Sequence, residues 1–281
     1  MIQQEQASGG LSVETLCEVL DVSASGYYAW CEREVSPRQQ ADARLGDEIE
    51  RVFMESRRTY GSQRVYLALC EGGIRSSRKR VARLMRERGL RSVRARKRRV
   101  GLTKAGQSAY FVPNLLNQDF EASDVNEKWV TGTTYIPTRE GWLYLVSVMD
   151  LFSRQVVGWA MGEHHDADLA TSALDMAIGR AHPPAGLILH SDRGSEFANA
   201  TFHQRAADAH IWLSMSNTGN CYDNAAAESF FATVKLEAIP EGIFASHREA
   251  RRALFDYIEV FYNRQRLHSG IDYDRPVSRA A

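Results

Sequence analysis

Two carboxylates and one amine in the last third of the chain have the residue types and spacing for chemistry on a phosphodiester. Asp192 stands just past an apolar run that ends at His190, and thirty-five residues separate it from Glu228. Lys235 falls on the same face of a predicted helix as Glu228. Taken alone, an acid and a base at this spacing are more typical of a solvated helix face.

The elements around Asp192 have the periodicity of an α/β domain. Three β-rich runs at 128–136, 142–149 and 155–161 are joined by short turns and predict an antiparallel meander. The elements expected next are a helix at 169–181, a strand at 187–190, a helix near 200–209, a strand at 211–215 and a helix from about 224. This order matches the ribonuclease H fold, a mixed sheet with flanking helices. Asp192 would then stand at a strand end, where open sheets bind ligands.

Charge is unevenly distributed, although the formal net charge is zero. From Arg75 to Arg99 there are thirteen Lys or Arg residues and a single acid, Glu87. Such a run binds nucleic acid by releasing counterions from the phosphates, and a merely solvated helix face explains so dense a run less well. The candidate DNA contacts in it are Arg78, Lys79, Arg83, Arg86, Arg94, Arg96, Lys97, Arg98 and Arg99.

Helical periodicity accompanies this basic run. We expect an amphipathic helix over 42–55, a second helix capped by Ser62, and a third capped by Ser76 or Ser77 and ended by Gly89. Three short helices with a basic third one are typical of an all-α helix-turn-helix unit whose third helix enters the major groove. The tail after it would follow phosphates or the minor groove.

The first forty residues carry a weaker signal. The stretch 11–32 is equally compatible with a helix-turn-helix fragment and with a helical hairpin that only packs. Pro37 and the polar residues after it predict a short linker. The expected organisation is an N-terminal helical segment at 1–40, a helix-turn-helix DNA-binding domain at 41–101, a linker at 102–123, a ribonuclease H-like core at 124–238 and a C-terminal helical extension of the core at 239–281.

Several classes of protein are disfavoured by composition. No run approaches the roughly 20 apolar residues that a membrane span needs, and the N-terminus lacks the pattern of a secretion signal. The four cysteines are far apart, with no C-x-x-C pair for zinc or redox chemistry. We therefore expect a cytoplasmic protein with reduced cysteines and no membrane partner.

Four stretches resemble one known family: WLYLVSVMDLFSRQVVGWAM, HSDRGSEF, GNCYDNAAAESFFATVKLE and YNRQRLHSGIDYDRP. They resemble the catalytic core shared by retroviral integrases and DDE transposases. More narrowly, they are similar to the second-frame (OrfB) subunit of bacterial insertion-sequence transposases of the IS-three family. The resemblance covers most of the chain from about residue 40.

The resemblance implies a metal-dependent enzyme that nicks DNA 3′ ends and transfers them to a target. It implies two Mg²⁺ or Mn²⁺ ions on three carboxylates, of which Asp192 and Glu228 match two, and a DNA-end contact by Lys235. The implied partners are double-stranded DNA at the insertion-sequence ends and the target, further copies of the chain in a homo-oligomer, and a first-frame (OrfA) protein.

One position departs from the family pattern. The first strand of the family reads W-x-x-D-x-T-Y, whereas this chain has Gly132 three residues after Trp129. Glycine cannot bind a metal ion through a side chain and weakens a strand, so local propensity gives no reason for it. Three explanations are open: a decayed or regulatory copy, an introduced loss of activity, or a substitute ligand elsewhere.

Candidates for a substitute ligand are weak. Those near the motifs in sequence are Asp150, Asp223, Glu196 and Glu127, and Asp150 belongs to the family pattern itself. The cluster 163–166 has metal-binding residue types, but Asp166 or Asp168 is better explained as a helix N-cap, and His190 as a packed histidine.

The expected function is a transposase subunit that binds insertion-sequence ends and, by resemblance, nicks and transfers them, with activity in doubt because of Gly132. The alternative is a catalytically inactive DNA-binding protein that inhibits or regulates transposition. An RNA-cleaving hydrolase of the same fold fits less well, because the basic helical unit suits duplex DNA. Metal-dependent cleavage would separate the enzyme from the binding protein.

Overall fold

A five-stranded mixed sheet forms the centre of the larger part of the chain. The structure is a computed structural model that describes residues 12–93, 110–239 and 242–281. The strands are β1 (Lys128–Thr138), β2 (Gly141–Asp150), β3 (Val156–Gly162), β4 (Ile188–Ser191) and β5 (Trp212–Met215), in the spatial order β3-β2-β1-β4-β5. The first three pair antiparallel, and β4 and β5 add in parallel beside β1. The predicted meander and the mixed sheet of the ribonuclease H type are confirmed.

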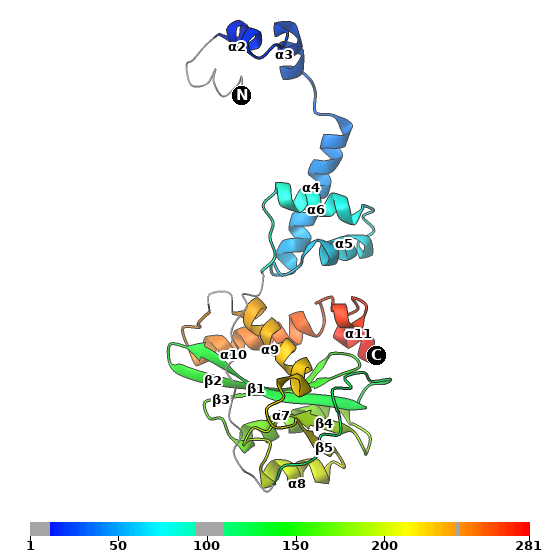
Figure 1. Cartoon of the computed structure of the whole chain (residues 1–281), viewed down its shortest axis with the longest axis vertical. Coiled ribbons are helices and arrows are strands. Elements are labelled where there is room, and N and C mark those ends of the chain that lie inside the picture. The colour runs from blue at the N-terminus through cyan, green and yellow to red at the C-terminus, as the bar shows by residue number, and fades with distance from the viewer. Residues whose placement is uncertain (1–11, 94–109, 240–241) are drawn as a thin grey trace.

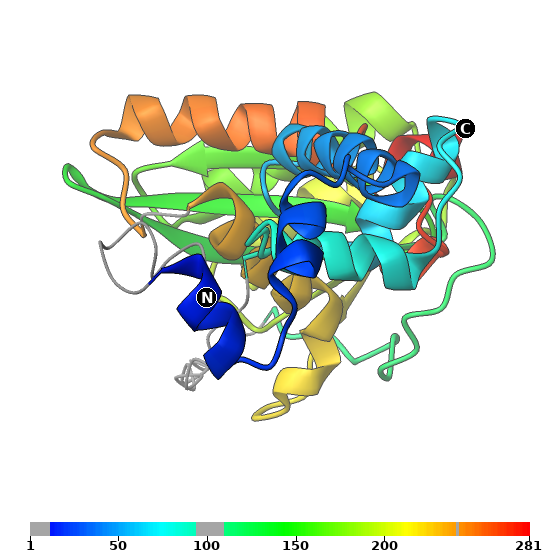
Figure 2. The same cartoon turned by 90° about the horizontal axis from the view of Figure 1, so that it is seen from above.

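Helices cover both faces of this sheet (Figure 1). One face packs on α7 (Ala167–Ala181) and α8 (Ala200–Asp208), and the other on α9 (Ala225–Ala238), α10 (His247–Phe255) and the π-helix η2 (Asp256–Tyr262) that continues α10. Figure 2 shows α10 and its continuation running alongside the long strands. Successive residues of β1 point to opposite faces, so Trp129 is buried on the α7 side and Val130 on the α9 side.

Three helices form the basic unit that precedes the core: α4 (Pro37–Glu55), α5 (Ser62–Glu71) and α6 (Arg78–Glu87). Ile49, Val65 and Val81 are fully buried among them. Ser77 caps α6, as predicted, by accepting a hydrogen bond from the backbone of Arg80. The predicted all-α unit with a basic third helix is therefore present.

Two boundaries in this unit were predicted wrongly. The linker expected at Pro37 is the first turn of α4, because Ser36 forms a capping box with Gln39 and proline is favourable at the first helical position. The N-cap of α5 is Gly61, without a side-chain hydrogen bond, and Ser62 is its first residue.

The N-terminal helices α2 (Val13–Val19) and α3 (Ala24–Cys31) form a short pair capped by Ser12 and Ser23. Figure 1 shows the pair away from the sheet, joined to the rest through the start of α4. No helix in the described ranges is both long and apolar enough to cross a membrane.

The helical unit is held to the core through the C-terminal region, which ends in the 3₁₀ turn η3 (Ser269–Ile271) and α11 (Pro276–Ala280). The buried hydroxyl of Tyr60 donates to the carbonyl of Gln265 at 3.1 Å and accepts from the backbone N–H of Leu267 at 2.7 Å. Arg275 forms an ion pair with Glu71 at 2.6 Å. These contacts place the basic helices and the sheet in one assembly.

Candidate active site and DNA-binding surface

Asp192 and Glu228 face a common space at one end of the sheet. Asp192 follows β4, and its Oδ1 accepts a hydrogen bond from the backbone N–H of Gly194 at 2.9 Å. The residue is exposed as a whole, yet desolvation by the surrounding protein raises the pKa of its carboxyl, and the charge of Glu196 raises that pKa further. Glu228 lies in the first turn of α9, and its pKa is raised by desolvation and by the charge of Asp192. Folding thus brings the two predicted acids within electrostatic reach of each other.

Gly132 lies between the elements that carry these acids. It is in β1 and faces α9: a Cβ added there would be 3.1 Å from the Phe231 ring, 3.5 Å from Nδ2 of Asn224 and 3.7 Å from Cβ of Ala227, the residue before Glu228. Val130 pairs with His190 in the parallel β1–β4 ladder, so Gly132 and Asp192 are each two residues further along neighbouring strands. A carboxylate at position 132 would join the space that Asp192 and Glu228 face.

The residues present do not complete a metal centre of the type that the resemblance implies. Asp192 and Glu228 offer hard oxygen ligands, and their pKa values are raised first by desolvation and then by neighbouring negative charges, Glu196 for Asp192 and Asp192 for Glu228. Gly132 offers no ligand. Within residues 12–93, 110–239 and 242–281, no three His, Cys, Asp or Glu side chains are arranged to hold a metal ion. Two hard ligands without the third fit a pair of divalent ions poorly.

Two of the candidate substitutes serve turns instead. The buried carboxylate of Asp150 accepts from the backbone N–H groups of Asn126 and Ser153, both at 2.8 Å, and from the hydroxyl of Ser153 at 2.7 Å. Glu127 accepts from the backbone and hydroxyl of Ser123 at 2.7 and 2.9 Å. These bonds engage both carboxylate oxygens of Asp150 and Oε2 of Glu127.

Asp223 secures the loop before α9. Its Oδ1 accepts from Gln118 and Asn220 at 2.8 and 2.6 Å, and its Oδ2 accepts from Asn114 and from the backbone of Asn217 at 3.0 and 2.8 Å. Desolvation opposes the charged form, but these hydrogen bonds prevail and lower the pKa of Asp223. The residue holds the segment around 114–118 against the loop that leads to Glu228.

Glu196 is the additional acid that the fold does bring to Asp192. Its buried Oε1 accepts from the hydroxyl of Thr133 at 2.7 Å and lies 2.6 Å from Nε2 of His165, while its Oε2 has no hydrogen-bond partner among the described residues. Thr133 points to the α7 face of β1 and Gly132 to the α9 face. Glu196 therefore stands on the opposite face of the sheet from the missing side chain and does not replace it.

Two predicted structural roles are confirmed. His190 is fully buried, with its ring nitrogens 2.8 Å from the hydroxyl of Ser214 and 3.2 Å from that of Ser216, and burial lowers its pKa to about 4. Asp166 is the N-cap of α7, accepting from the backbone of Leu169 at 2.9 Å.

The helix that carries Glu228 is fixed at its far end. Glu237 forms a two-bonded ion pair with Arg266, at 2.8 and 2.7 Å, and accepts from the hydroxyl of Tyr257 at 2.7 Å. Both ion-paired side chains are buried. Lys235, in the last turn of α9, is half-buried and seven residues from Glu228 on the same helix.

The basic helix α6 divides into two groups of residues. Arg78, Lys79 and Arg86 are exposed. Arg83, by contrast, pairs with Asp42 at 2.7 Å and with Glu87 at 2.9 Å, so it bridges helices inside the unit. The remaining candidates Arg94, Arg96, Lys97, Arg98 and Arg99 lie outside the described residues.

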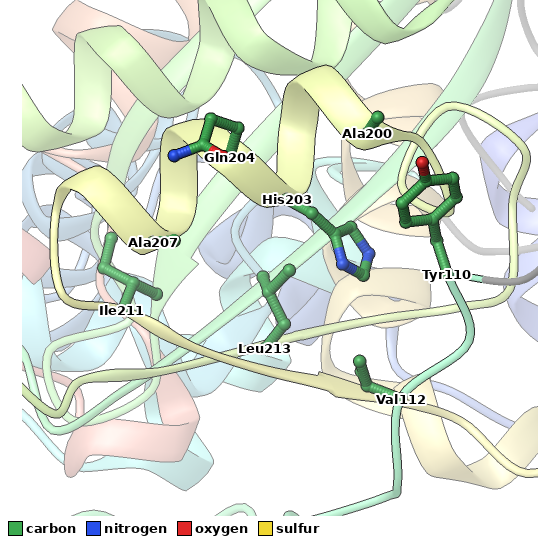
Figure 3. A pocket seen from close by; sticks show the side chains of 8 residues that line it. All are labelled: Tyr110, Val112, Ala200, His203, Gln204, Ala207, Ile211 and Leu213. Carbon is green, nitrogen blue, oxygen red and sulfur yellow. The ribbon is translucent and has the colours of Figure 1, made fainter.

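A separate pocket lies at the β5 edge of the sheet (Figure 3). The side chains that line it are Tyr110, Val112, Ala200, His203, Gln204, Ala207, Ile211 and Leu213. The rings of Tyr110 and His203 are 5.4 Å apart across it. None of the predicted site residues lines this pocket, which is therefore distinct from the space around Asp192 and Glu228.

Sequence reasoning named Glu196 as a candidate ligand but did not predict its contacts with Thr133 and His165. Glu196 was close to Asp192 in sequence, but sequence gives no indication of which strand face a loop residue reaches. The one available signal was the strand alternation that puts Thr133 and Gly132 on opposite faces.

Comparisons with known proteins agree with this arrangement. Residues 39–98 match an HTH-like domain family, and residues 122–221 and 209–276 match integrase core domain families. An uncharacterized 31 kDa protein of insertion element IS600 from Shigella sonnei is 43% identical over 263 residues, covering 94% of this chain and 96% of the relative. Transposase InsF for insertion sequence IS3A from Escherichia coli strain K12 is 40% identical over 273 residues, covering 95% of this chain and 93% of the relative.

Among solved structures, the HTLV-2 integrase catalytic core domain in complex with magnesium matches with a TM-score of 0.44 at 17% identity, covering 57% of this chain and all of that one. The helical unit, the mixed sheet and the near full-length relationship to InsF lead to one conclusion. The chain belongs to the IS3-type family of insertion-sequence transposases.

Proposed function

We propose that this transposase chain binds insertion-sequence ends through the exposed basic face of α6, and that its core performs metal-dependent nicking and strand transfer only when position 132 carries a carboxylate. The observation that supports the second part is the direction of Gly132. Its missing side chain points at α9 beside Glu228, one strand away from Asp192. The unchanged chain is thus an end-binding subunit with an incomplete catalytic centre.

The expected loss of strand-transfer activity can be judged from how metal sites respond when the groups around the ion are changed. Changes in groups that only orient metal ligands cost about 10–100-fold in metal affinity or activity. Removing a metal ligand outright should lower metal affinity and activity by more than this. The two carboxylates that remain repel each other, and no complete ion site offsets that repulsion. We therefore expect strand transfer by the unchanged chain to be at or near background.

A regulatory role is the second candidate, and the charges on α6 favour it. Arg78, Lys79 and Arg86 remain exposed although the catalytic centre is incomplete. A chain that occupies an insertion-sequence end without cutting it competes with an active transposase for that end. We propose that oligomers mixing this chain with an active copy are inhibited for the same reason.

Binding without cleavage is the direct test. A labelled duplex carrying an insertion-sequence end is titrated with the protein in EDTA and in Mg²⁺, and nicking is followed on a denaturing gel. We expect the same affinity in both buffers and no nick. The matched control is the Arg78→Ala/Lys79→Ala double variant, which should bind weakly in both. Nicking by the unchanged chain in Mg²⁺ alone would show that another group supplies the missing ligand, and failure to bind would remove the end-binding role.

A further inference from the structure

A group of aromatic rings lies beside the acidic site and is not used by the proposed function. It consists of Tyr135, Trp142, Tyr144 and His165, here called the aromatic platform. The Tyr135 ring is 6.0 Å from Trp142 and 5.1 Å from Tyr144, and Tyr144 stacks on His165 at 5.3 Å with the planes 9° apart. Tyr135 is 45% exposed and Trp142 56% exposed. Large apolar rings gathered at one exposed place point to a binding surface, whereas scattered ones would not.

The platform is connected to the loop that begins at Asp192. Oε1 of Glu196 accepts from Thr133 at 2.7 Å and lies 2.6 Å from Nε2 of the platform residue His165. Tyr135 is two residues beyond Thr133 on β1, so it lies on the same α7 face of the sheet as Thr133 and Glu196, and not on the face of Gly132. Its pKa is raised by desolvation and also by the charges of Glu196 and Asp192, so its hydroxyl is within electrostatic reach of both acids. The platform therefore lies on the α7 face of the sheet and is joined through Glu196 to the loop that begins at Asp192, so a DNA strand crossing this end of the sheet would reach both.

We propose that the aromatic platform stacks an unpaired nucleobase of the DNA strand held at the Asp192 site. The inference rests on the proposed function in one respect, that the ligand is DNA. Aromatic side chains bind bases by stacking, which tolerates any sequence because every base has a π-face. This mode suits the location, because Asp192 and Glu196 repel phosphates but not the face of a neutral base.

An unpaired base is the fitting ligand because exposed rings reach a base face only where the base has left the duplex stack. Unstacking a base costs a few kcal/mol. Stacking on Tyr135 and Trp142 would offset part of that cost and hold the strand in register beside the acids. The platform would thereby distinguish an opened or single-stranded DNA end from a closed duplex.

The test uses 2-aminopurine, a base analogue whose fluorescence falls on stacking. It is placed in a short single-stranded extension of a duplex end and, separately, in a free single strand. The variants are Trp142→Ala and Tyr135→Ala, with Trp142→Phe as the conservative replacement. The matched control is Trp212→Ala, since Trp212 is equally open at 63% exposed but lies on the edge strand β5.

We expect the unchanged chain and Trp212→Ala to quench the fluorescence, and the platform alanine variants to lose the quenching and bind the extension roughly 10-fold more weakly. Trp142→Phe should recover most of both signals, and blunt-duplex affinity should stay constant throughout. Quenching that survives in Trp142→Ala and Tyr135→Ala overturns the proposal.

Two further outcomes separate this inference from other possibilities. If the platform variants change the number of subunits in solution while quenching persists, the surface contacts another copy of the chain and the proposal is wrong. If the unchanged chain fails to bind the blunt duplex but still quenches the free single strand in a Trp142-dependent way, the end-binding role fails and the platform stands.

Discussion

Gly132 is a glycine that neither a turn nor a left-handed backbone explains. Gly132 lies in the extended strand β1, a conformation that any residue adopts. The described atom nearest to an added Cβ belongs to the Phe231 ring, at 3.1 Å, and this ring would have to shift by a few tenths of an ångström. The backbone thus accepts aspartate, and what the glycine removes is one carboxylate oxygen pair from the space beside Glu228.

Neutralising one of the two remaining acids should stabilise the fold at neutral pH. Asp192→Asn keeps an oxygen for the N–H of Gly194 and removes the charge. Since the folded pKa of Asp192 is raised above the ordinary 3.8, its contribution to stability is complete below that value and is lost as pH rises through the folded pKa. The variant should therefore melt at a higher temperature near pH 7, with a smaller difference near pH 4. Calorimetric scans at the two pH values check this, and a gain independent of pH would contradict it.

At the scale of elements, α9 positions Glu228 and is itself fixed by the ion pair between Glu237 and Arg266. Both side chains are 6% exposed, and Tyr257 completes the hydrogen bonding of the carboxylate. Removing one partner of such a pair leaves the other charge buried and unpaired. The free energy lost in this way is much larger than the net stabilisation that the intact pair provides. The position of Glu228 beside Asp192 therefore depends on a contact at the other end of its helix.

Arg266→Ala should lower the free energy of unfolding by about 3–5 kcal/mol, because Glu237 would remain buried and unpaired. The comparison is Arg51→Ala, which removes exposed ion pairs to Glu48 and Glu55 and should cost less than about 1 kcal/mol. Urea denaturation followed by circular dichroism measures both. An equal loss of unfolding free energy in the two variants would mean that the Arg266 contact does not anchor α9.

The sheet and the helices were predictable within a few residues, because strand alternation and helical periodicity reflect burial directly. The start of α4 could not be predicted in the same way. Pro37 resembles a helix breaker unless Ser36 and Gln39 are recognised as a capping box. The two acids of the site were predictable from motif and spacing. The Glu196 contacts to Thr133 and His165 were not, because they depend on which face of the sheet a loop crosses.

At the scale of the whole molecule, the basic helices and the acidic site are parts of one assembly joined through Tyr60 and the Arg275–Glu71 ion pair. The run from Arg75 to Arg99 is strongly positive in sequence, and the excess acid lies in the rest of the chain. Under the proposed function, DNA would thus be captured by the helical unit and presented to a core in which acidic residues outnumber basic ones.

The two groups of basic residues on α6 should behave differently when replaced. Arg78→Ala and Lys79→Ala should each weaken end binding and reduce the slope of log affinity against log salt by about 1, since each exposed cation neutralises a phosphate. Arg83→Ala should instead lower the melting temperature of the helical unit, because Asp42 loses a partner. Fluorescence anisotropy titrations at several salt concentrations and thermal scans distinguish the two effects. A full salt slope in the Arg78→Ala/Lys79→Ala variant would show that DNA contacts another face.

Strand transfer by position-132 variants tests the central claim most directly. A labelled, pre-cut insertion-sequence end is incubated with target DNA in Mg²⁺ or Mn²⁺, together with the unchanged chain, Gly132→Asp or Gly132→Asn. The asparagine variant matches aspartate in size and differs in charge. We predict joining by Gly132→Asp alone, exceeding the other two by more than the roughly 10–100-fold that changes outside the ligand set cost. Joining by the unchanged chain, or end binding without joining by Gly132→Asp, would contradict the account.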